Sequence, residues 1–130
     1  MDELELYIKK HQENKIKSQD FVEHLYYLMD KNNIANSSDI YNKVFISRQL
    51  WSSIISKKSQ PSLLVCVKIA LALKLSNSEC KLLLKKAGYT LASSNKFALI
   101  IRYALDNKIY DIVEVNNLLI SHGCEEFKLL

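Results

Sequence analysis

The chain has 130 residues, 48% of them hydrophobic and 25% charged, which is enough for one globular domain with its own apolar core. Only two glycines and one proline occur, too few for many tight hairpins, so we expect helices joined by short polar connections. The formal net charge is +4, and residues 40–78 carry all of their charge as Lys and Arg, with no Asp or Glu. Such a basic segment is typical of a protein that binds a polyanion, although a solvated surface rich in lysine has the same composition.

The sequence also restricts the cellular setting. No apolar run approaches the roughly 20 residues of a membrane-spanning helix. The start of the chain is acidic, with Asp2, Glu3 and Glu5, and lacks the apolar region of a secretory signal. The three cysteines are odd in number and show no CxxC spacing, so we expect reduced thiols, with Cys66 in the core. These features predict a cytoplasmic protein without a membrane association.

The spacing of apolar residues predicts eight helices, if the first is stable, and no strand. Ser18 and Ser47 are the expected N-caps of the second and fourth helices, and Gly88 is a natural residue to follow the sixth. The fifth helix is apolar nearly all round, which is typical of a central helix. A loop is expected over Tyr89–Ser93. In chain order the predicted helices cover about residues 2–12, 18–31, 37–44, 47–57, 62–75, 77–87, 94–107 and 111–121.

The third and fourth predicted helices are separated by a tight turn near Lys43–Ser47. A pair of this kind needs apolar residues between its helices and polar residues on the outer face of the second one. The apolar positions expected to pack inside are Ile40, Val44, Phe45, Ile46, Trp51 and Ile54. The polar side chains left outward at the start of the second helix are Arg48, Gln49, Ser52 and Ser53.

The stretch from Ser37 to Ile55 resembles the helix-turn-helix of the XRE, or λ-repressor, family. The resemblance continues in Lys58-Ser59-Gln60-Pro61-Ser62, which is similar to the family's loop ending in Pro-Ser. It ends in Lys68-Ile69-Ala70-Leu71-Ala72-Leu73, which is similar to the family's following helix with Ile-Ala-x-Ala-Leu. About residues 20–88 are covered. The implied fold is all-α, with a λ-repressor-like helix-turn-helix core and additional N- and C-terminal helices.

The segment after Gly88 resembles the tail of small bacterial and phage proteins related to the XRE family, in which extra helices pack on the helix-turn-helix. We therefore expect a single helical domain over residues 1–130. Its parts are an N-terminal helix at 1–17, the helix-turn-helix core at 18–88 and a C-terminal helical extension at 89–130.

The resemblance implies a transcriptional regulator that reads the major groove of double-stranded DNA with the helix at about residues 47–57. Arg48, Gln49 and Ser53 would face base edges, since Arg suits guanine and Gln suits adenine. Lys57 and Lys58 would lie close to phosphates. A homodimer is expected to span two half-sites, with the C-terminal helices as its interface. The full set of implied DNA-binding residues is Ser37, Lys43, Ser47, Arg48, Gln49, Ser52, Ser53, Lys57 and Lys58.

Two positions motivate an alternative. The family commonly has Ala where this chain has Tyr41 and Gly where it has Phe45, and the chain contains only two Arg. It could therefore be a non-enzymatic adaptor or inhibitor, related to phages or defence, that keeps the fold and binds a protein partner instead of DNA. An enzyme is not expected, because no nucleophile elbow, phosphate loop or metal-ligand spacing occurs. We expect no catalytic residue, no metal and no cofactor.

Overall fold

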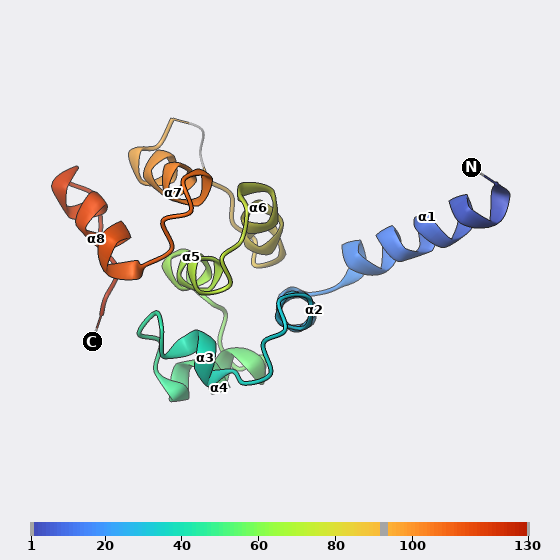
Figure 1. The fold of residues 1–130 in the computed structure, drawn as a ribbon. Coiled ribbons are helices and arrows are strands. Elements are labelled where there is room, and N and C mark those ends of the chain that lie inside the picture. The colour runs from blue at the N-terminus through green and yellow to red at the C-terminus, as the bar shows by residue number, and fades with distance from the viewer. Residues whose placement is uncertain (1, 92–93, 130) are drawn as a thin grey trace.

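The computed structural model describes residues 2–91 and 94–129, and these form an all-α structure of eight helices without strands, as the sequence predicts. Figure 1 shows α5 in the middle of the body, with α6 and α7 on one side, α3 and α4 on the other, and α1 projecting outward. Residues 92 and 93, at the end of the predicted loop Tyr89–Ser93, lie outside the described residues. The helices are α1 (Glu3–Ser18), α2 (Phe21–Lys31), α3 (Ser38–Tyr41), α4 (Arg48–Ile55), α5 (Leu63–Ala72), α6 (Asn77–Lys86), α7 (Lys96–Asp106) and α8 (Ile112–Ser121).

The first two helices differ from the prediction at their junction. Helix α1 continues past Gln12 to Ser18, because no Gly or Pro interrupts this stretch. Ser18 is therefore not the N-cap of α2, as the sequence predicted, but the last residue of α1. Asp20 is the cap instead, and its carboxylate accepts the backbone N–H of Glu23 at 2.9 Å.

The later helices begin at side-chain caps, which explains why their positions follow the prediction closely. Helix α3 is the exception, because Ser37 makes no side-chain cap bond and the helix lasts only from Ser38 to Tyr41. Each of the other caps accepts a backbone N–H in the first turn of its helix, which satisfies a donor that the helix itself cannot. The capping residues of α4 to α8 are Ser47, Ser62, Ser76, Asn95 and Asp111.

Several helices end at a residue with a left-handed backbone conformation. Gly88 follows α6 with φ +87°, as expected, and the N–H of Tyr89 then donates to the carbonyl of Leu84 at 2.9 Å. The same left-handed turn closes other helices at non-glycine residues, where a side chain makes it costlier. These residues are Asn33 after α2, Lys57 after α4, Lys74 after α5 and Lys108 after α7.

Helix α5 is the centre of the core, and its residues 66–72 are all buried. It packs against α6 and α3, while α2 packs on α6 and α7 on α8. The same core continues through α8 to Phe127 near the C-terminus. In the described part of the chain, no helix combines the length and apolarity needed to cross a membrane.

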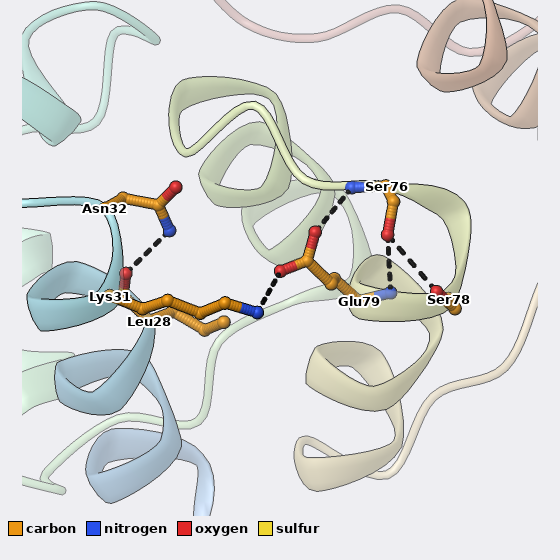
Figure 2. A network of polar contacts seen from close by, with 6 residues as sticks. All are labelled: Leu28, Lys31, Asn32, Ser76, Ser78 and Glu79. Atoms are coloured by element: carbon orange, nitrogen blue, oxygen red, sulfur yellow. Dashed lines mark hydrogen bonds and ion pairs between the residues drawn. The ribbon is translucent and has the colours of Figure 1, made fainter.

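A polar network joins the end of α2 to the start of α6 (Figure 2). Glu79 accepts the backbone N–H of Ser76 at 3.0 Å, and Ser76 accepts the N–H of Glu79 at 3.3 Å, which together form a capping box. The second oxygen of Glu79 pairs with Lys31 of α2 at 3.3 Å. These bonds lower the pKa of Glu79, and the bond from the Ser76 backbone N–H has the largest effect. One carboxylate therefore both starts α6 and fixes it to α2.

Buried polar side chains hold the C-terminal tail, residues 124–129, against the body. Asn116 of α8 accepts the backbone N–H of Phe127 at 2.7 Å and donates to the carbonyl of Phe127 at 3.3 Å. Lys68 of α5 donates to the carbonyl of Lys128 at 2.6 Å. The ring of Phe127 is buried against Phe97 of α7, with ring centroids 6.3 Å apart. The tail is thus a fixed part of the fold.

Candidate nucleic-acid interface

Helices α3 and α4 pack together through the apolar residues that the sequence placed between them. The side chains of Ile40, Val44, Ile46, Trp51 and Ile54 are all buried. Tyr41 is half-buried and lies beside Trp51, with ring centroids 5.8 Å apart and tilted planes. A tyrosine is therefore accommodated between these two short helices by contact with the indole ring.

Phe45 does not fill the turn, contrary to the prediction. It adopts a left-handed backbone with φ +57°, and 45% of its surface is exposed. This backbone reverses the chain, so that the next residue, Ile46, enters the core, and its N–H donates to the carbonyl of Tyr41 at 2.9 Å. The carbonyl of Phe45 accepts a hydrogen bond from the ammonium of Lys68 at 3.3 Å. The turn is closed by Ile46 and Lys68, and the phenyl ring faces solvent.

The first turns of α4 present polar side chains outward. Ser47 caps the helix by accepting the N–H of Leu50 at 3.0 Å. Arg48, Gln49 and Ser52 are exposed, as predicted. Ser53 was also predicted to face outward but is half-buried, and its carbonyl accepts the backbone N–H groups of Lys58 and Ser59 that close the end of the helix. The outward polar face of α4 is therefore formed by its N-terminal part, from Arg48 to Ser52, rather than by its whole length.

The two lysines after α4 have different surroundings. Lys57 pairs with Asp20, the N-cap of α2, with 2.6 Å between its ammonium nitrogen and a carboxylate oxygen. The pKa of Asp20 is lowered mainly by the hydrogen bond from the Glu23 N–H and next by the bond from Lys57. The same bond to Asp20 raises the pKa of Lys57. Lys58 is exposed. Both lysines were predicted to bind phosphate. Lys57 forms an ion pair that connects the end of α4 to the start of α2, which the sequence spacing did not indicate.

The surface charge of the basic segment is smaller than its sequence suggests. Lys68 is buried in α5, where desolvation lowers its pKa. Lys57 is paired with a carboxylate. The remaining cations between residues 40 and 78, all exposed, are Lys43, Arg48, Lys58 and Lys74.

Lys43 lies in a groove beside the α3–α4 turn. The groove has a volume of about 430 Å³ and is also lined by Lys74, after α5, and Lys108, after α7. The acidic residues Asp111 and Glu114 line the same groove, so its charge is mixed. Lys43 was predicted from the sequence, whereas Lys74 and Lys108 were not. Lys108 is far from Lys43 in the chain, and the packing of α7 brings it to this groove. Ser37, also predicted, is half-buried at the start of α3.

The described residues contain no group of three or more His, Cys, Asp or Glu side chains that could hold a metal ion. Cys66 and Cys80 are buried thiols, and burial raises the pKa of Cys66 to about 12 and that of Cys80 to about 11. His24 is buried in α2, where its ring nitrogen bonds Gln19 at 3.1 Å. These groups are placed as parts of the core.

Comparison of the chain with protein-family models, curated proteins and solved structures found no match.

Proposed function

We propose that this protein is a DNA-binding transcriptional regulator, with α3 and α4 as a λ-repressor-like helix-turn-helix and α4 as the helix that enters the major groove. The observation that carries the proposal is the outward face of α4. Trp51 and Ile54 anchor the inner side of this helix in the core, while Arg48, Gln49 and Ser52 are exposed on its first two turns. The N-terminal part of the second helix is the part that meets base edges in such a motif.

The chemistry of these side chains suits DNA. The guanidinium of Arg48 can donate two hydrogen bonds to the O6 and N7 atoms of guanine, and the amide of Gln49 can pair with adenine. Lys58 and Lys43 would add phosphate contacts, whose contribution to affinity falls as salt increases. One short helix buries little surface, so specific binding would use a dimer on two half-sites about one helical turn apart.

The turn supports the same proposal. Where the resembled family commonly has glycine, Phe45 adopts φ +57°, the left-handed conformation that glycine adopts most easily. The chain thus makes this turn without glycine, at the cost of some backbone strain. The departure from the family's residue type does not by itself remove the turn.

The test is a fluorescence-anisotropy titration with a pool of random duplexes at low and moderate salt. We expect Lys58→Glu to weaken this non-specific binding and to reduce the slope of log K against log salt by about one. Lys81→Glu, an exposed lysine on α6, is the matched control and should leave both unchanged. A duplex selected from the pool should then lose about 1–3 kcal/mol of binding free energy on Arg48→Ala. Absence of binding at low salt, or equal effects of the two Lys→Glu variants, would contradict the proposal.

A second candidate function is a protein-binding adaptor, which would use the same surface. It is favoured by the exposed apolar side chains of Phe45 and Leu50 beside the polar face of α4. Exposed apolar residues at the centre of a polar rim are typical of protein interfaces. A defined partner whose binding is abolished by Leu50→Glu but not by Leu99→Glu, at an exposed apolar position on α7, together with no DNA binding, would support this function over the first.

A further inference from the structure

The ammonium of Lys68 joins two segments that are far apart in the chain. It donates to the carbonyl of Phe45, in the α3–α4 turn, at 3.3 Å and to the carbonyl of Lys128, in the C-terminal tail, at 2.6 Å. Figure 1 shows the tail running from α8 toward α3 and α4. One side chain of the central helix α5 therefore connects the entry to α4 with the end of the chain.

The two carbonyls keep this ammonium in the interior. Lys68 is 6% exposed, and among the described residues it forms no ion pair. A buried charge is stable only where hydrogen-bond acceptors replace water. An ammonium has three donors, so both carbonyls bind it at once without competing. Loss of either acceptor leaves a donor unsatisfied, and the long side chain then gains by turning its ammonium toward solvent.

The Phe45 carbonyl lies where the chain enters α4. Phe45 has a left-handed backbone, with φ +57°, and stands two residues before Ser47, the N-cap of α4. The turn is closed on one side by the hydrogen bond from the Ile46 N–H to the carbonyl of Tyr41 at 2.9 Å. The bond from Lys68 holds the other side. A strained backbone persists only where its surroundings hold it, so this second bond contributes to the direction in which α4 begins.

The other end of the connection is itself held in place. The side chain of Asn116 in α8 bonds both the N–H and the carbonyl of Phe127, and Phe127 is 2% exposed. The next carbonyl along the chain is that of Lys128, which Lys68 binds. The tail therefore presents this acceptor from a fixed position against α8. A change in the position of the tail reaches the α3–α4 turn through a single side chain.

We infer that the C-terminal tail supports the entry to α4 through Lys68, so that displacement of the tail releases the α3–α4 turn. Lys68 is a positioning residue, because it acts on α4 through the backbone of Phe45. The support of the turn does not depend on what α4 binds. Its consequence for DNA recognition rests on the proposed function, since a released turn presents Arg48 and Gln49 less rigidly to base edges.

The bond to the tail can be weakened without changing any side chain. Cys124 allows native chemical ligation of a synthetic segment of residues 124–130 to the rest of the chain. In this segment, an ester in place of the Lys128–Leu129 amide makes the Lys128 carbonyl a weaker acceptor. An ester in place of the Glu125–Glu126 amide is the matched control, because the groups that it changes make no hydrogen bond among the described residues. The amide N–H that the first ester removes makes none there either.

Hydrogen exchange of the Ile46 amide, followed by NMR on the full-length ligated chains, reports opening of the turn. Relative to the amide of the buried Ile101 in α7, it should exchange about 3–10-fold faster with the Lys128–Leu129 ester. The control ester should leave it unchanged. Lys68→Met, which removes the ammonium from both carbonyls, should increase it by about 10-fold or more. Equal exchange in the two ester chains, which keep every side chain, or no effect of Lys68→Met, would overturn the inference.

DNA binding by the same chains separates this inference from the proposed function. Lys68→Met changes no exposed cation, so it should lower the ratio of affinities for selected and random duplexes while the salt dependence of random-duplex binding stays unchanged. Faster Ile46 exchange in the Lys128–Leu129 ester, with no DNA binding by any chain, would contradict the proposed function and support the inference. Selective DNA binding with unchanged Ile46 exchange in that ester would contradict the inference alone.

Discussion

The amide of Asn116 is predicted to hold the C-terminal tail, and its removal should be measurable as a loss of stability. Asn116 is buried, and its side chain makes both hydrogen bonds available at the backbone of Phe127. Asn116→Leu keeps nearly the same volume and removes both bonds. The ring of Phe127 would still favour burial, but the backbone N–H and carbonyl of that residue would lose their partner.

The magnitude follows from the two bonds. The 2.7 Å bond from the Phe127 N–H is short, and leaving such a donor buried and unsatisfied costs about 1–3 kcal/mol. The 3.3 Å bond is weaker and contributes about 0.5 kcal/mol. We therefore expect Asn116→Leu to lower the free energy of unfolding by about 2–3 kcal/mol. Phe127→Ala, which empties a site that is 2% exposed, should cost about 3–5 kcal/mol.

Urea denaturation provides the measurement, because the chain has one tryptophan and Trp51 is buried in α4, on the α3–α4 unit rather than on the tail. If Asn116 and Phe127 act on one tail, the double variant should cost little more than Phe127→Ala alone, a coupling of about 2 kcal/mol. Exposed Asn117→Leu, next along α8, is the control and should change stability by less than about 0.5 kcal/mol. Full additivity of the two substitutions, or an Asn116→Leu effect as small as the control, would refute the reasoning.

Three further predictions concern single sites. Gly88→Ala should lower the free energy of unfolding by about 1 kcal/mol in the same urea assay, because a Cβ there meets open space and only the left-handed backbone is unfavourable for alanine. Ala87→Gly, at the preceding position, is the contrasting variant and should not increase stability, because the backbone of residue 87 is not left-handed. Burial, aided by the charge of Lys86, lowers the pKa of His24 from its ordinary 6.5. The folded state then binds fewer protons than the unfolded one, so stability should fall as the pH drops below about 6.5, and His24→Gln should remove this slope from urea midpoints at pH 7.5 to 5; an unchanged slope would assign it elsewhere. With thiol reagent at pH 8, only the half-buried Cys124 should react rapidly in the folded protein, whereas rapid modification of the buried cysteines without denaturant would contradict their packing.

Part of the candidate interface was predictable from local patterns. The exposure of Arg48, Gln49 and Ser52 follows from the spacing of Trp51 and Ile54, because residues that alternate with a buried stripe on a helix must face outward. The behaviour of Phe45 was not predictable in this way. Its apolar side chain suggested burial, whereas the left-handed backbone that closes the turn directs it to solvent.

By itself, the sequence determined that the described chain is helical and where most of the helices begin. The reason is that apolar spacing and caps such as Ser47 and Ser76 act between residues within one turn of each other. Only the tertiary structure decided how charge is distributed. It buried Lys68 between the α3–α4 turn and the tail, and it paired Lys57 with Asp20. Those partners are far apart in the chain, so no local pattern encodes them, and their positions follow from how the helices pack.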